Sequence, residues 1–284
     1  MKYIKQVLPS NANIFLIGDR HKGSGFSSDS DWEKTVDMIH SEYDGVEHNL
    51  VVDHGDCIEG IHIDDYRYDP LVHKDSVLRQ MEDCSNDYKA IKDNMICMLD
   101  GNHPTAKALK RFGEVTRKIC EDAGIQFGTW SSHISYVDKK GRPMFNHFAT
   151  HGRRSITSSL TDPHRRRAAL EHSLRNTLRN KFGDCLLMSR GHTHKVITSS
   201  PERDLYLYMD KGSICQGYKT NCMGVDYIPP SLRYYASTGS FYKLYGEDGM
   251  VSYAEEADYD PIEIGFIIAK VRDKELVGLD EIIL

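Results

Sequence analysis

The chain has 284 residues, of which 39% are hydrophobic and 27% are charged, an ordinary composition for a globular protein. The formal net charge of −6 gives no overall indication of nucleic-acid binding, and no apolar stretch approaches the roughly 20 residues that a membrane helix needs. The seven cysteines form no Cys-x-x-Cys pair and the N-terminus lacks the apolar core of a signal peptide, so we expect reduced thiols, no membrane association and a cytoplasmic location.

The first half of the chain alternates predicted strands and helices. Short apolar runs predict buried strands at residues 13–17, 50–53 and 94–99. Helices are predicted at 31–43, 73–91 and 104–122. Asp31 is the expected N-cap of the first helix, Pro104 suits the first turn of the third, and Gly124 is its expected terminator. Residues 61–70, rich in Asp and Tyr, are predicted to be irregular.

The second half is richer in strands. Strands are predicted at 132–137, 143–150, 185–189, 205–209, 234–245 (interrupted by Gly239), 262–271 and 275–284. Asp162 and Pro163 open the one helix expected here, which runs to about Lys181. Strands that alternate with helices indicate an α/β protein. No linker or repeat divides the chain, so we expect a single domain.

Polar residues follow five of the predicted strands. Each strand ends in glycine next to Asp, Asn or His: Gly18-Asp19-Arg20-His21, Gly55-Asp56, Gly101-Asn102-His103, His151-Gly152 and Gly191-His192-Thr193-His194. Sites of α/β proteins form at the carboxyl ends of strands. Any one of these motifs alone is more typical of a turn or loop. Five together favour a site for two metal ions, with Asp56 as the bridging carboxylate.

This donor set matches a known kind of chemistry. Two cations about 3.5–4 Å apart can hold the attacking and leaving oxygens of an in-line displacement at phosphorus. Neutral imidazoles suit metals such as zinc, iron or manganese, and carboxylates suit harder ions. Such ions also lower the pKa of bound water toward neutrality.

In order and spacing, these motifs resemble those of the calcineurin-like metallophosphoesterase family. The resemblance covers residues 13–194, and Ser237-Thr238-Gly239-Ser240 is similar to a Gly-Ser element that the family often carries downstream. It implies a four-layer β-sandwich flanked by helices, with a dinuclear metal site at the strand C-terminal ends. One domain would span residues 1–284, with strands from 204–284 completing the sandwich.

The resemblance also implies a role for each matched residue. Asp19, His21 and His194 would hold the first metal, and Asn102, His151 and His192 the second, with Asp56 between them. His103 would assist the leaving group, as a proton donor or by stabilising charge. The cofactor would be two divalent ions (Mn, Fe, Zn or Ni), with Mn expected to support activity in an assay.

Two positions depart from the family pattern. Pro104 stands where the family usually has Asp or Glu after Gly-Asn-His, so a carboxylate that could orient His103 is missing there, and Asp100 is a candidate substitute. Glu59 stands where the second motif often has Asp, and its role stays open. His54 and His147 are interpreted as supporting or packing residues rather than ligands.

A basic segment lies between two of the ligand motifs. Residues 153–181 hold eight basic residues against two acidic ones. Arg153 and Arg154 follow His151 directly, so we expect them to bind substrate phosphate, a role to which the arginine fork is suited. The remaining arginines could equally form a solvated helix face. Tyr66, Tyr68, Tyr227, Tyr234 and Tyr235 could supply stacking platforms for bases, although tyrosine is common in this chain.

We therefore predict a metal-dependent phosphoric ester hydrolase in which a metal-bridging hydroxide attacks phosphorus. The basic segment favours a phosphodiesterase or nuclease that acts on nucleotides or nucleic acid. One alternative is a phosphomonoesterase for protein or small-molecule substrates. A second is a metal-binding scaffold that has lost turnover, and a third is a nucleic-acid-binding module with incidental histidines.

Overall fold

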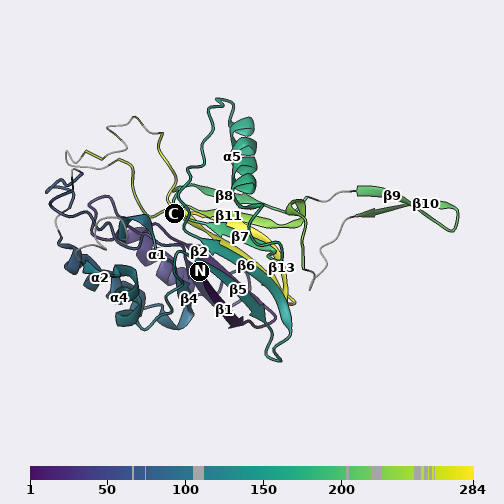
Figure 1. Ribbon diagram of the computed structural model, residues 1–284, viewed down its shortest axis with the longest axis horizontal. Coiled ribbons are helices and arrows are strands. Elements are labelled where there is room, and N and C mark those ends of the chain that lie inside the picture. Colours follow the sequence, from purple (N-terminus) through teal and green to yellow (C-terminus); the bar gives the residue numbers. More distant parts are fainter. Residues whose placement is uncertain are drawn as a thin grey trace.

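The computed structural model describes residues 1–65, 67–73, 75–104, 112–202, 205–218, 226–245, 251–252, 255, 258 and 260–284. Two sheets stack face to face (Figure 1). The first contains β13 (Glu275–Ile283), β12 (Gly265–Arg272), β2 (Ala12–Ile17), β3 (Asn49–Asp53) and β4 (Met95–Met98), in that order. The second contains β1 (Lys2–Val7), β5 (Ser131–Val137), β6 (Pro143–Thr150), β7 (Leu187–Arg190), β11 (Tyr234–Thr238) and β8 (Val196–Ser199).

Successive side chains of a strand point to opposite faces of the sheet, and this explains how the layers pack. In β2, Ile14 and Leu16 point into the core between the sheets, where they meet residues such as Leu187 of the second sheet. Phe15 and Ile17 point the other way, into a core shared with the helices. Every residue of β2 is buried, as a strand covered on both faces requires.

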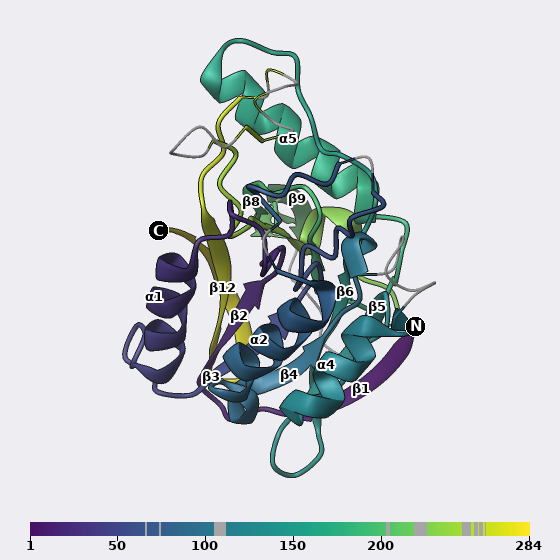
Figure 2. The same ribbon diagram turned by 90° about the vertical axis from the view of Figure 1, so that its left-hand side faces the viewer.

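Helices cover both outer faces (Figure 2). The first sheet is covered by α1 (Asp29–His40), α2 (Val77–Lys89) and α4 (Val115–Ala123), and the second by α5 (Pro163–Leu178). Short 3₁₀ turns, η1 (Lys92–Asn94) and η3 (Pro230–Leu232), precede β4 and β11. The result is helix, sheet, sheet, helix, so the α/β class expected from the sequence is present in the described residues. None of the described helices has the length and apolarity to span a bilayer.

Several predicted boundaries shift. The N-cap of α1 is Ser28 rather than Asp31, and Asp31 lies in the first turn, where it accepts a hydrogen bond from the Ser28 hydroxyl at 2.6 Å. The predicted caps Asp162 and Gly124 are confirmed, and Gly124 adopts the left-handed conformation with φ 72°. Of the helix predicted at 104–122, residues 105–111 lie outside the described residues.

Sequence patterns missed three strands. β1 is an edge strand in which Tyr3 and Val7 stay exposed, so its sequence lacks the signature of a buried strand. β8 is short, and only its pairing with β11 in the folded chain defines it as a strand. β10 (Ser213–Tyr218) pairs with β9 (Leu205–Asp210).

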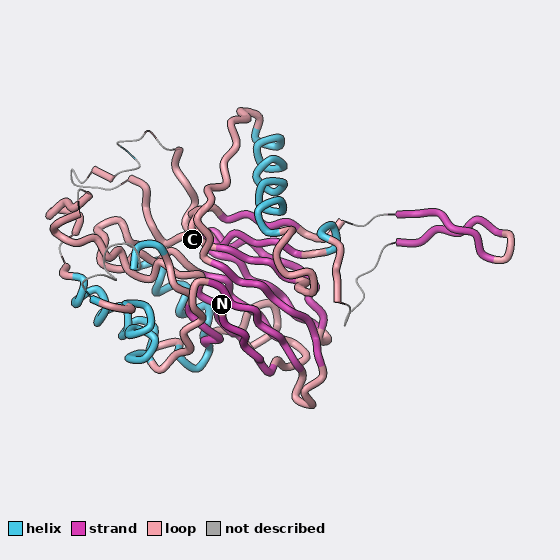
Figure 3. Tube along the Cα trace, viewed as in Figure 1, coloured by secondary structure: helices cyan, strands magenta, loops and turns pink. Residues whose placement is uncertain are grey.

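The β9–β10 hairpin corrects the expectation that strands from 204 onward complete the sandwich. These two strands form a sheet of their own and extend away from the body (Figure 3). Leu207, Met209 and Ile214 are 66%, 64% and 74% exposed. The apolar and aromatic run that predicted a strand at 205–209 therefore lies in an exposed arm. β11, β12 and β13 do join the two main sheets.

The burial of side chains between the two sheets leads to a prediction about the free energy of unfolding. Leu16 is fully buried between the sheets on the strand that leads to Asp19, so Leu16→Ala should lower the free energy of unfolding by about 2–5 kcal/mol. Leu207→Ala, on the exposed hairpin, should change it by less than about 0.5 kcal/mol. Urea denaturation of the two variants measures the difference. Equal losses would contradict this assignment of the core.

Candidate metal centre

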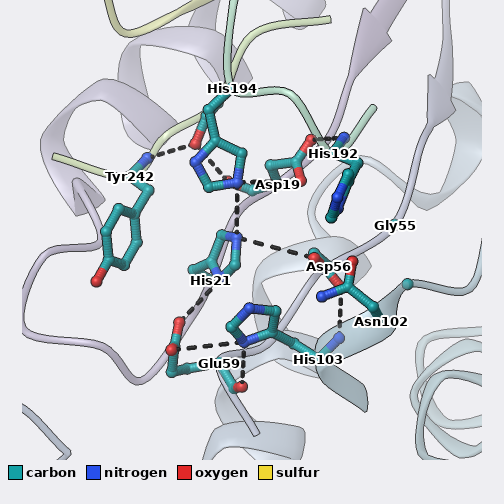
Figure 4. Close-up of polar contacts among 12 residues, drawn as sticks. Asp19, His21, Gly55, Asp56, Glu59, Asn102, His103, His192, His194 and Tyr242 are labelled. Atoms are coloured by element: carbon teal, nitrogen blue, oxygen red, sulfur yellow. Dashed lines mark hydrogen bonds and ion pairs between the residues drawn. The ribbon is translucent and has the colours of Figure 1, made fainter. Parts of the chain in front are cut away.

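The predicted ligands converge at one place. Asp19 and His21 follow β2, Asp56 follows β3, Asn102 follows β4, His151 follows β6, and His192 and His194 follow β7. β2, β3 and β4 run parallel in one sheet, and β6 and β7 run parallel in the other. Parallel strands deliver their carboxyl ends to the same edge, and the stacked sheets bring the two edges together. Figure 4 shows the side chains of Asp19, His21, Asp56, Asn102, His192 and His194 gathered at one place.

Possible ligand atoms form two adjoining groups. Asp19, His21 and His194 offer atoms within 4.8 Å of one another, and so do Asp56, His151 and His192. Asn102 joins the second group, because its Oδ1 lies 2.9 Å from His151 Nε2. His21 also groups with Asp56 and His103, which links the two sets through Asp56. The structure thus brings together all seven residues that the sequence pattern selected.

The backbone at these ligands is unusual. Eleven of the described non-glycine residues have a positive φ, and five of them are predicted ligands: Asp19 (52°), His21 (50°), Asp56 (50°), His192 (72°) and His194 (51°). Each such residue costs on the order of 1–3 kcal/mol and persists only where its surroundings enforce it. Five strained residues in one cluster indicate that the backbone is shaped for the side chains it presents.

Backbone hydrogen bonds hold the strained loops. The Asp19 amide donates to Gly55 O at 2.8 Å, and the His21 amide donates to Asp56 O at 2.9 Å. Gly101 is required beside Asp56, since a Cβ at this position would lie 2.1 Å from Asp56 Oδ1. The glycines of the sequence motifs are therefore explained partly by close packing between loops.

The downstream Ser-Thr-Gly-Ser element supports the same loops. The Ser240 hydroxyl donates to Asp19 O at 3.1 Å, and the Ser237 and Thr193 hydroxyls are 2.6 Å apart. Arg190 is 1% exposed, and its guanidinium donates to Arg154 O and, at 3.3 Å, to Gly191 O. Arg190 thereby joins the two ligand loops that follow β6 and β7. Sequence reasoning missed this role, because a lone arginine before a motif carries no signal.

Hydrogen bonds at Nδ1 orient two of the ligand histidines. His151 Nδ1 lies 2.7 Å from His54 O, and His21 Nδ1 lies 2.8 Å from Glu59 Oε2. A proton on each Nδ1 leaves Nε2 as the free lone pair, which is how metal-binding histidines are commonly held. His21 Nε2 and His194 Nε2 point at the same space and are 3.2 Å apart.

Glu59 is the residue whose role the sequence left open. It is 2% exposed, and its carboxylate lies between three histidines: His21, His103 at 3.5 Å and His73 at 3.9 Å. His103 Nδ1 also donates to Glu59 O at 2.8 Å. Glu59 thus supplies the support for His103 that Pro104 cannot. Asp100, the substitute suggested by the sequence, instead accepts a hydrogen bond from Thr116 at 2.7 Å.

The pKa shifts of Asp56, His103 and His21 agree with this arrangement of side chains. Burial opposes ionisation of Asp56, but His151 and His103 hold the pKa of its carboxyl well below the usual range. Burial would lower the pKa of His103, but Glu59 and Asp56 raise it above its ordinary value. Burial, and then His103, lower the pKa of His21, which favours its neutral form. Neutral histidine is the form that binds metal, and protonated histidine is the form that donates a proton.

The donor set fits divalent metal ions. Asp19 Oδ1 is buried and has no hydrogen-bond partner, although His194 Nε2 lies 3.3 Å away. An unsatisfied buried carboxylate oxygen among imidazole nitrogens is costly unless a cation completes the site. Imidazole, carboxylate and amide oxygen together accept several first-row metals, so the residues do not select one.

Other predicted residues lie around this centre. His54 Nε2 and His147 Nε2 lie 2.6 and 2.5 Å from Ser189 Oγ, deep between the sheets, so both have the supporting role expected for them. Arg153 and Arg154 are exposed. The Arg153 guanidinium lies 4.9 Å from the Trp130 ring, which in turn packs edge-on against His151 at 5.3 Å. Arg153 is therefore close to the centre through Trp130, a residue that the sequence did not single out.

The arginines of α5 are largely engaged in ion pairs. Arg166 pairs with Asp260, Arg167 with Glu171 at 2.8 Å and with Glu281, and Arg175 with Glu202. These contacts favour the structural interpretation of the basic helix over a continuous groove for a nucleic-acid strand. Tyr66, one of the candidate stacking residues, lies outside the described residues.

Comparisons with known proteins assign no family. Neither a protein-family profile nor a curated protein sequence matches the chain. Solved structures do match, and one is the Haemophilus influenzae NAD nucleotidase (NadN), with 10% sequence identity and a TM-score of 0.39, over 96% of this chain and 50% of that one. The chain thus spans about half the length of that protein. A similarity at this level carries no argument about function.

Protonation of His151 leads to a prediction about metal binding. Burial would lower its pKa, but Asp56, whose Oδ2 lies 3.3 Å from His151 Nε2, raises the pKa of His151 to about 9. The metal-free protein therefore holds this proton at neutral pH, and a metal ion must displace it. Apparent Mn²⁺ affinity should rise about tenfold per pH unit for each displaced proton between pH 6 and 9.

Isothermal titration calorimetry checks this in buffers with different ionisation enthalpies. Proton release at pH 7 should be clear in the unmodified protein and smaller in His151→Asn. His40→Asn, at an exposed position of α1, should behave like the unmodified protein. Mn²⁺ binding without proton release at pH 7 would contradict the assignment.

Proposed function

We propose that this protein is a dinuclear metal-dependent phosphoesterase, and that it acts on phosphodiesters of the nucleotide or nucleic-acid type. One observation carries the proposal. Seven side chains of the kinds that bind metal converge from five strand ends, and one of them is the buried carboxylate of Asp56. Asp19, His21 and His194 would hold one ion, Asn102, His151 and His192 the other, and Asp56 both.

Each ion would supply positive charge to the phosphoryl group and lower the pKa of water at the site. The chain's own residues do the rest. His103 presents its ring 4.5 Å from that of His21, and its amide donates to Asp56 Oδ1 at 2.9 Å. Since Glu59 and Asp56 favour the protonated form, His103 can deliver a proton to the departing oxygen. Glu59 fixes its ring through Nδ1, so Nε2 is the atom that donates.

The preference for a phosphodiester rests on Arg153 and Arg154. Both guanidinium groups are exposed beside the His151 loop, where they can reach phosphate oxygens outside the metal centre. The ion pairs of α5 make a long basic groove less well supported than a local contact of this kind. Manganese is the metal that we expect to support activity in an assay.

Asp56→Asn tests the metal centre. Replacing the bridging carboxylate with an amide should reduce Mn²⁺-dependent hydrolysis of bis-p-nitrophenyl phosphate by more than about 100-fold, because both ions lose a charged ligand. Asp37→Asn, at an exposed position of α1, is the matched control and should retain full activity. A labelled single-stranded oligonucleotide and p-nitrophenyl phosphate, assayed in parallel, define the substrate class. Bound metal without hydrolysis of any of these would contradict the enzymatic role and favour a scaffold.

His103→Gln tests the proton donor. The loss of kcat should reach roughly 10²–10⁴-fold for a dinucleotide, whose alkoxide leaving group needs a proton. The loss should be much smaller for bis-p-nitrophenyl phosphate, because nitrophenolate leaves without one. Equal losses for the two substrates would contradict proton donation and leave His103 with a purely electrostatic role.

A further inference from the structure

A pocket opens directly beside His103. It has a volume of about 630 Å³ and is lined by residues from several separate parts of the chain, including Glu59, Arg67, Tyr68, His73, His103 and Tyr242. This volume is in the range of small-molecule sites and exceeds what a phosphoryl group needs. Because His103 is the proposed proton donor, the pocket lies where the departing group of the substrate would be.

The bottom of the pocket is formed by apolar and aromatic side chains. Phe26, Val72 and Tyr242 are at most 4% exposed and form a small core cluster of their own. The Tyr242 ring lies 5.0 Å from that of the ligand His21 and 5.7 Å from that of Phe26 (Figure 4 shows Tyr242 beside His21). The wall of the pocket therefore adjoins the candidate metal centre, because Tyr242 contacts both Phe26 and His21.

One wall presents a ring suited to stacking. Tyr68 is half-buried and lies nearly parallel to His73, with ring centroids 5.8 Å apart and planes at 28°. His73 is 6% exposed, lines the same pocket and holds the Tyr68 ring through this contact. Tyrosine supported in this way offers a rigid aromatic surface at low cost in conformational entropy.

The loop that carries Tyr68 is built before any ligand arrives. The Tyr68 amide donates to Asp65 O at 2.9 Å, and the His73 amide donates to Asp69 O at 2.7 Å. Val72 O accepts from the Gly25 amide at 2.9 Å, which ties this loop to the loop after β2. Arg67, Asp69 and Ser252 line the same pocket and are held by the chain itself: the Arg67 guanidinium donates to Asp65 at 3.0 Å, Asp69 Oδ1 accepts from the Leu71 amide at 2.8 Å, and the Ser252 hydroxyl donates to Leu244 O.

We propose that this pocket binds a nucleoside as the leaving group, so that the substrate carries a nucleoside on the scissile phosphate. The nucleobase stacks on Tyr68, and polar groups of the residues that line the pocket contact the edge of the nucleobase and the sugar. The apolar and aromatic side chains at the bottom of the pocket disfavour a charged peptide as its occupant. This inference rests on the proposed function and specifies its substrate.

The reaction balances with the groups already described. The bond between phosphorus and the nucleoside oxygen breaks, and a water oxygen forms the new bond to phosphorus. His103 gives its proton to the nucleoside oxygen, and a proton of the water replaces it. The products are the free nucleoside and the remaining phosphate ester.

Tyr68→Ala is the test, with Tyr3→Ala as its matched control. Tyr3 on β1 lies against His133 with the same centroid distance, 5.8 Å, and is 64% exposed. Two diesters with alkoxide leaving groups are compared in Mn²⁺: adenylyl-adenosine and glycerophosphoglycerol, which has no ring. Tyr68→Ala should lower the ratio of their kcat/KM values about tenfold, as loss of one stacking contact predicts, while Tyr3→Ala leaves it unchanged.

Equilibrium dialysis with labelled adenosine gives a readout that does not need turnover. Adenosine should bind the unmodified protein and Tyr3→Ala alike, and about tenfold more weakly to Tyr68→Ala. Hydrolysis of bis-p-nitrophenyl phosphate with no adenosine binding and an unchanged ratio would overturn the pocket and leave the phosphoesterase standing. Tyr68-dependent adenosine binding without hydrolysis of any ester would uphold the pocket as a nucleoside site and overturn the proposed function.

Discussion

The burial of the Asp56 carboxylate is the constraint on which the rest of the structure depends. Its Oδ1 accepts the amide of His103, its Oδ2 faces His151 and His21 at 3.3 and 4.0 Å, and its carbonyl accepts the amide of His21. A buried charge is tolerated only when donors or cations surround it. The loops after β2, β4 and β6 must therefore all reach one point. Two stacked sheets with coincident strand ends satisfy that requirement.

This convergence has a cost in backbone strain. Five of the seven candidate ligands lie in the left-handed region of φ, and the loop that contains Asp19 and His21 is held there by hydrogen bonds to the loop that contains Asp56. Rigid, fully buried strands such as β2 and β3 anchor the loops from below. Strain of this kind keeps ligand atoms close together before any ion binds, which is the arrangement that a preorganised metal centre needs.

The two sides of the proposed centre differ in character. On one side, Arg153 rests on Trp130 and presents positive charge toward solvent. On the other, Tyr68, Tyr242 and Phe26 line a pocket next to His103. Glu59 connects the candidate metal centre with the residue beside the pocket, because its carboxylate orients the candidate ligand His21 and its carbonyl holds His103.

The sequence by itself determined which residues meet at the centre. Glycine next to Asp, Asn or His at the end of an apolar run is a local signal, and parallel strands convert that signal into proximity. It also predicted the helix caps at Asp162 and Gly124, which depend on neighbouring residues alone. Only the tertiary structure decided the role of Glu59, the link made by Arg190, the pocket around Tyr68, and the separation of β9 from the sandwich. The first three features depend on contacts between segments that are far apart in the chain. The fourth depends on strand pairing, which the apolar sequence of β9 permits but does not specify.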